Sequence, residues 1–94
     1  MYIVFLSYTR PMNEVDAVLE PHVAWINRYF AEGIFISAGR KEPRTGGMIL
    51  VKDIDRAKLD AILAEDPFQA VARYEVTKIQ VTRAADDFAA LVGI

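Results

Sequence analysis

The stretch YIVFLSY, Tyr2–Tyr8, decides the fold. It is a short run of β-branched and aromatic residues bounded by Thr-Arg-Pro, which is typical of a β-strand. Both of its alternating faces are apolar, because Ile3 and Phe5 lie on one side and Val4 and Leu6 on the other. A strand of this kind is stable when both of its faces are covered. We therefore expect a sheet with a packed layer on each side.

Working outward from this strand, the remaining patterns alternate between helix and strand. Short helical turns are expected over residues 14–20 and 66–72, and a helical tail over residues 85–93. The longer elements expected are a helix from Pro21 to Glu32 closed by Gly33, strands over Ile34–Ala38, Met48–Lys52 and Tyr74–Thr82, and a second helix over residues 53–66. Within the first helix, the spacing predicts an apolar stripe toward the sheet, made of Val23, Ile26, Tyr29 and Phe30.

The order β-α-β-β-α-β predicts a single α+β domain over residues 1–94, a ferredoxin-like plait with a four-stranded antiparallel sheet. Two helices cover one face of such a sheet. The other face meets water, which the tyrosines at the strand ends could tolerate, or it packs on another body. We expect a homodimer in which two sheets stack. The tail, residues 84–94, is expected to pack on the domain or on the partner.

Composition narrows the function classes. Hydrophobic residues make up 53% of the chain and charged residues 26%, as in a globular domain. A net charge of −2 gives no basic excess for nucleic acid or an anionic membrane. Without cysteine there is no disulfide, Cys-based zinc site or thiol nucleophile, and with one histidine a multi-His metal site would need another subunit. The first residues show no basic leader and are too few to span a bilayer, so we expect a cytoplasmic protein.

The only histidine and the only tryptophan, His22 and Trp25, lie three residues apart. Pro21 suits the first helical position, which puts His22 in the first turn. There the positive end of the helix dipole disfavours the imidazolium, and a neutral imidazole is a competent general base. The alternative is a histidine with no role. Trp25, one turn further on, could wall a pocket or could simply belong to the core.

Three further features could carry chemistry. Asp66 precedes a proline and is expected to cap a helical turn, with acceptor sites to spare for a second role. The loop GRKEPRTGG brings Arg40 and Arg44 close to three glycines, which indicates either an anion-binding loop or a solvated hairpin. Ser37 offers a hydroxyl near a strand end as a further binding group. No motif for a metal or an organic cofactor is found.

The stretches PHVAWINRYFAEGIFISAGR, PRTGG and AEDPF together resemble the YCII-related (YciI-like) proteins, a family of the dimeric α+β barrel superfamily that also holds muconolactone isomerases and monooxygenases. The resemblance runs from the first strand to the fourth. It implies the ferredoxin-like fold and a sheet-to-sheet homodimer. It also implies that His22 and Asp66 match the family's proposed His–Asp active-site pair.

Three functions remain open at this point. The first is a cofactor-free lyase or isomerase, of the dehydrochlorinase or muconolactone isomerase kind, in which the His22–Asp66 pair moves protons on a small cyclic or aromatic acid. Substrate contacts are then expected from Trp25, Ser37, Arg40 and Arg44. The second is a non-catalytic module that binds a small ligand or serves a partner protein. The third is a cofactor-free monooxygenase acting on a quinol.

Overall fold

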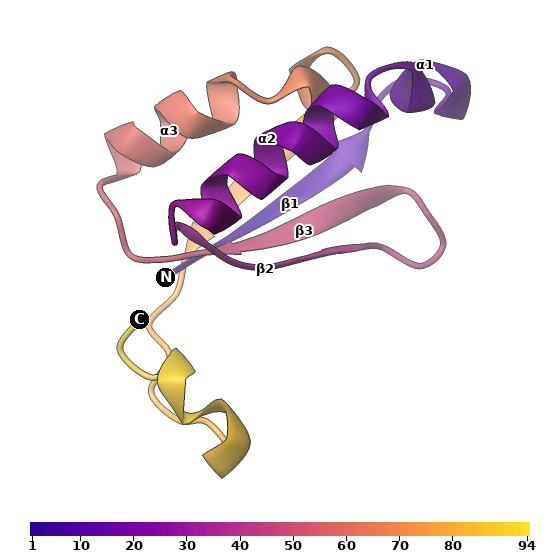
Figure 1. Cartoon of the computed structure of the whole chain (residues 1–94). Coiled ribbons are helices and arrows are strands. Elements are labelled where there is room, and N and C mark those ends of the chain that lie inside the picture. The colour runs from indigo at the N-terminus through magenta and orange to yellow at the C-terminus, as the bar shows by residue number, and fades with distance from the viewer.

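The computed structural model describes all residues, 1–94, and has two helices lying over a four-stranded sheet (Figure 1). Strands β1 to β4 lie side by side in the order β2-β3-β1-β4, and every neighbouring pair is antiparallel. This arrangement confirms the expected ferredoxin-like plait. The elements are β1 (Tyr2–Tyr8), α1 (Met12–Ala17), α2 (Leu19–Ala31), β2 (Phe35–Arg40), β3 (Gly46–Val51), α3 (Arg56–Ala64), β4 (Ala72–Lys78) and the 3₁₀ helices η1 (Pro67–Ala70) and η2 (Asp86–Leu91).

Some element boundaries match those expected from the sequence, and others differ. Strand β1 has the bounds expected for it, and a 3₁₀ turn follows Asp66 as expected. Helix α2 begins at Leu19, so Pro21 is its third residue and not its first. Strand β4 both begins and ends earlier than expected, at Ala72 and Lys78. None of the helices combines the length and apolar character needed to cross a membrane.

The core lies between the sheet and helices α2 and α3, which cover one face of the sheet (Figure 1). Tyr2, Val4 and Leu6 alternate along β1 toward the helices and are almost fully buried. Each of them is paired in register with a residue of β3 and a residue of β4. The helices contribute mainly Trp25, Tyr29, Leu59, Ile62 and Leu63, and η1 contributes Phe68.

The buried stripe of α2 is rotated from the one expected. The residues that α2 buries are His22, Trp25 and Tyr29, whereas Val23 and Phe30 are 43% and 39% exposed. The expected stripe correctly included Tyr29 and the partly buried Ile26, but it omitted His22 and Trp25. Here each inward residue has a polar tip, and each tip finds a hydrogen-bond acceptor: Asp66, the carbonyl of Ile62, and Glu65, respectively. Aromatic rings with satisfied polar tips are buried as readily as aliphatic ones.

Gly33 and Gly46 are two of the positions at which the backbone requires glycine. Gly33 has a φ of 73° after the end of α2. Its N–H and that of Ile34 donate to the carbonyls of Phe30 and Tyr29, which forms a Schellman motif and confirms that Gly33 closes the helix. Gly46 opens β3, where a Cβ atom would lie 1.8 Å from the carbonyl oxygen of Leu6. Only glycine lets these two strands approach so closely.

Strand β2 contains a bulge. Phe35 pairs with Val51, but the next pair is Ser37 with Leu50, so Ile36 is an extra residue. The bulge reverses the alternation along the rest of the strand. It puts Ser37 on the face away from the helices, and it puts Ala38 and Arg40 on the helix side.

The second face of the sheet is not covered by any helix (Figure 1). Ile3, Phe5 and Leu50 share it by register, and Phe5 is 40% exposed. The segment after β4 leaves the sheet, and its helix η2 buries no residue. Its last residue returns to the start of β1, where the backbone nitrogen of Met1 donates to the carbonyl of Ile94 at 2.8 Å.

Candidate functional site

Asp66 occupies a buried position between α3 and η1 and is only 2% exposed. It is the N-cap of η1, as expected, because its Oδ1 accepts a hydrogen bond from the backbone N–H of Phe68 at 2.9 Å. Pro67 at the first position of η1 needs no such acceptor. This capping hydrogen bond fixes the carboxylate of Asp66 at the start of η1 and leaves its remaining acceptor sites free for side chains.

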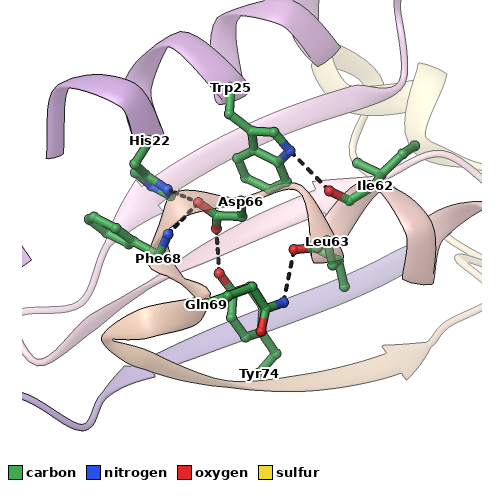
Figure 2. A network of polar contacts seen from close by, with 8 residues as sticks. All are labelled: His22, Trp25, Ile62, Leu63, Asp66, Phe68, Gln69 and Tyr74. Carbon is green, nitrogen blue, oxygen red and sulfur yellow. Dashed lines mark hydrogen bonds and ion pairs between the residues drawn. The ribbon is translucent and has the colours of Figure 1, made fainter. Parts of the chain in front are cut away.

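His22 comes to this carboxylate from the first turn of α2, 44 residues earlier in the chain. The distance from Nδ1 to Oδ1 of Asp66 is 2.6 Å, and both side chains are nearly inaccessible to water. The imidazole also lies flat on the phenyl ring of Phe68, with the ring centroids 3.6 Å apart and the planes inclined by 2° (Figure 2). The structure therefore brings together the two residues that the sequence singled out as a pair.

The hydrogen-bond pattern fixes the tautomer of His22. An ionised carboxylate is an acceptor only, so the 2.6 Å contact requires a proton on Nδ1. In the neutral ring the lone pair then resides on Nε2, the one ring nitrogen without a partner in the protein. A histidine held in this way can accept a proton at Nε2 and return it, while the carboxylate stabilises the imidazolium formed in between.

A cavity of about 410 Å³ opens beside His22. Its wall is mainly apolar, with Leu19, Val23 and Ile26 contributed by α2, and the hairpin of β2 and β3 closes the opposite side. His22 and Val23 of α2 thus face a cavity of ligand size. Phe68 and Tyr8 complete the end of the cavity near Asp66.

Both arginines of the hairpin line this cavity, at the side opposite α2. Arg44 Nη2 donates to Asp16 of α1 at 3.0 Å, and this hydrogen bond raises the pKa of Arg44 above its ordinary value, so the guanidinium is cationic. Its Nε, however, is buried without any acceptor. A buried donor of this kind is unfavourable until an acceptor reaches it. Arg40 is exposed at the mouth of the cavity.

Two of the expected binding residues lie elsewhere. Trp25 belongs to the core, where its Nε1 donates to the carbonyl of Ile62 at 3.0 Å. Its ring lies 5.7 Å from that of His22, behind the histidine and outside the lining of the cavity. Ser37 is on the uncovered face of the sheet, because the bulge at Ile36 turns it away from the helices. Sequence spacing alone did not show this bulge.

The sequence reasoning missed Tyr74. This residue of β4 donates its hydroxyl hydrogen bond to Oδ2 of Asp66 at 2.5 Å (Figure 2). Burial, and then the hydrogen bond to Asp66, raise the pKa of Tyr74 well above its ordinary value, so it remains a phenol. The available signal was the alternation of Ala72, Tyr74 and Val76 on the helix side of β4, since a tyrosine buried there needs an acceptor.

The fold and the site define a small α+β protein with a buried imidazole–carboxylate pair at the wall of an apolar cavity. The chain belongs to the YCII-related family, because the model of the YCII-related domain matches residues 1–83 of the 94. This match confirms the resemblance seen in the sequence. The comparison with curated proteins finds no match. The segment containing η2 lies beyond the residues matched to the family.

Proposed function

We propose that this protein is an enzyme that moves protons between carbon or oxygen atoms of a small cyclic or aromatic acid, as a cofactor-free lyase or isomerase. One observation carries the proposal: the contact of 2.6 Å between His22 Nδ1 and Asp66 Oδ1, buried at the wall of a cavity of about 410 Å³. The contact leaves Nε2 as the base, at a position that a ligand in the cavity can reach.

The reaction begins when the lone pair of Nε2 takes a proton from an acidic C–H or O–H of the substrate. The electron pair of that bond moves into the conjugated system of the substrate, and Asp66 stabilises the imidazolium. In an isomerisation, His22 then returns the proton to a different carbon. In an elimination, the electron pair expels a leaving group such as chloride, and the imidazolium later releases its proton to water.

The cavity favours a substrate with an apolar body and one anionic group. Its lining is mainly aliphatic, and its cationic groups come from the hairpin opposite His22. The buried Nε–H of Arg44 needs an acceptor, and a carboxylate or phenolate oxygen would supply one. Arg40 adds a second positive charge at the entrance. An acid held in this way presents its ring to the side of the cavity where His22 lies.

We also propose that the working unit is a homodimer that stacks the uncovered faces of two sheets. Ile3, Phe5 and Leu50 form the apolar centre of that face. Phe5→Lys should convert the dimer to a monomer in sedimentation equilibrium at micromolar concentration, since burying a charged group between two stacked sheets is costly. Ala61→Lys, on the exposed side of α3, is the matched control and should leave the mass unchanged. A wild-type protein of monomer mass would overturn this proposal.

A second candidate is a non-catalytic module that binds the same class of acid. The flat stacking of His22 on Phe68 favours it, because the imidazole then contributes to packing as well. The monooxygenase alternative needs both Trp25 and His22 beside a quinol substrate, and of these two residues only His22 lines the cavity.

Hydrogen exchange into candidate substrates separates the enzyme from the module. The probes are an unsaturated lactone acid and a chlorinated hydroxyquinol in D₂O, followed by proton NMR. We expect deuterium uptake or conversion with the wild type, and a loss of at least about 100-fold in His22→Gln, the usual contribution of general acid–base catalysis. Glu65→Gln is the control, since Glu65 is the adjacent carboxylate and does not line the cavity.

The outcomes are distinct. A probe that raises the melting temperature of the wild type but is recovered without deuterium supports the binding module. Full exchange activity in His22→Gln contradicts the mechanism, even when a substrate has been found.

A further inference from the structure

The carboxylate of Asp66 is held by three donors that come from three different elements. His22 of α2 and the backbone N–H of Phe68 in η1 both donate to Oδ1, and the hydroxyl of Tyr74 in β4 donates to Oδ2 (Figure 2). No lysine or arginine forms a salt bridge with this carboxylate. His22 and Tyr74 are the only titratable side chains that hydrogen-bond to Asp66.

We propose that Tyr74 is a positioning residue of the site: its hydroxyl fixes the rotation of the Asp66 carboxylate and thereby the tautomer and orientation of His22. The catalytic consequence rests on the proposed function, but the positioning itself can be measured in the protein without substrate.

The geometry explains why a third donor matters. The two hydrogen bonds to Oδ1 alone would still allow the carboxylate to rotate about its Cβ–Cγ bond, with one oxygen staying near the N–H of Phe68. Tyr74 is the only donor to Oδ2, and in a site of 2% exposure an acceptor without a partner is costly. The three bonds together leave the carboxylate one orientation, which is the one that meets Nδ1 of His22.

The position of Tyr74 is itself fixed by the sheet. Tyr74 pairs in register with Leu6 of β1, on the side covered by the helices. Strand β4 also contacts η1 directly, so the hydroxyl of Tyr74 in the sheet reaches the carboxylate that caps η1. Because burial keeps Tyr74 a phenol, it remains a donor over the whole neutral range. A phenolate there would repel the carboxylate instead of orienting it.

The test uses the single histidine of the chain as its own reporter. In ¹⁵N-labelled wild type, long-range ¹H–¹⁵N spectra should show the tautomer protonated at Nδ1, with a slowly exchanging, low-field Nδ1 proton. In Tyr74→Phe, we expect exchange of that proton with water to be faster by at least about tenfold, the lower end for a hydrogen bond to a charged group, and the population of the Nε2-protonated tautomer to grow. Tyr29→Phe, which removes the hydroxyl that donates to the neighbouring Glu65, is the matched control and should leave the imidazole spectrum unchanged.

An imidazole spectrum of Tyr74→Phe identical to that of the wild type overturns the inference. If Tyr74→Phe does not fold, the wild type is labelled with 3-fluorotyrosine, whose more acidic hydroxyl donates more strongly. The Nδ1 proton resonance should then move, and an unmoved resonance overturns the inference equally.

Activity separates this inference from the proposed function. On a substrate that the wild type converts, Tyr74→Phe should lower kcat by about tenfold with little change in KM and should alter the pH–rate profile. If the wild type converts no probe while the imidazole spectrum responds to Tyr74→Phe, the proposed function fails and the positioning role stands.

Discussion

Glu65 and Asp66 are adjacent in the chain, and each accepts a hydrogen bond from a tyrosine hydroxyl at 2.5 Å. Their surroundings nevertheless differ in every other respect. The side chain of Glu65 is 45% exposed and lies near Arg28, whereas that of Asp66 is fully buried beside His22. One step along the chain thus separates a surface ion pair from the centre of the candidate site.

The difference comes from the end of α3. Glu65 is the residue at which this helix stops, and its side chain points outward to Tyr29 and Arg28 of α2. Asp66 is already extended and begins η1, so its side chain turns inward to cap the next helix. The comparison teaches that a tyrosine donor is common to both carboxylates, and that burial and a histidine distinguish the site.

The largest expected effect is on stability. Asp66→Ala leaves the imidazole of His22, the hydroxyl of Tyr74 and the N–H of Phe68 without an acceptor in a buried place. We expect a loss of about 3–5 kcal/mol in the free energy of unfolding, measured by urea denaturation at neutral pH. Glu65→Ala should lose no more than about 1 kcal/mol, because Glu65 itself is half exposed and its ion pair with Arg28 lies at the surface.

Repeating the urea denaturation at higher salt is the control for these two variants. In about 0.5 M NaCl the exposed contact of Glu65 with Arg28 is screened, so the effect of Glu65→Ala should shrink. The effect of Asp66→Ala should persist. Equal losses in the two variants would show that burial does not separate the two carboxylates.

Much of the fold could be predicted because strand β1 is apolar along its whole length and its neighbours are bounded by glycine and proline. The start of α2 could not be placed from Pro21, since proline is tolerated anywhere in the first turn and not only at its first position. The predicted stripe of α2 omitted His22 and Trp25 for a tertiary reason. Their hydrogen-bond acceptors, Asp66 and the carbonyl of Ile62, lie 44 and 37 residues away.

The candidate site was predicted in part. The resemblance to the family named His22 and Asp66, and the structure brings them into contact. Ser37 was suggested as well, because its hydroxyl lies near a strand end; with strict alternation it would share the helix side with Phe35. The bulge at Ile36 removes it from that side and supplies Ala38 and Arg40 in its place. Tyr74 was missed because a lone tyrosine in a strand gives no sign of its acceptor.

The smallest expected effect concerns alkaline pH and the two tyrosines. Burial is the main cause that raises the pKa of Tyr74 and of Tyr29, followed by the hydrogen bond to Asp66 or Glu65, and the increase is larger for Tyr74. In the unfolded chain both titrate near a pKa of about 10. The folded protein therefore keeps protons that the unfolded chain releases above this pH, so stability is fully present below about pH 10 and falls above it.

A phenylalanine has no hydroxyl proton to lose, so each Tyr→Phe variant lacks that tyrosine's contribution to the loss of stability at alkaline pH. Tyr74→Phe should have a lower melting temperature than the wild type at about pH 9, and this deficit should narrow toward about pH 11 as the wild type loses the advantage of its hydroxyl. The deficit of Tyr29→Phe should narrow less, because the pKa of Tyr29 is raised less. Thermal unfolding followed by circular dichroism at several pH values gives both curves. Parallel curves for the wild type and Tyr74→Phe would mean that Tyr74 ionises as easily as in the unfolded chain, and then burial would not be what distinguishes the Asp66 site from Glu65.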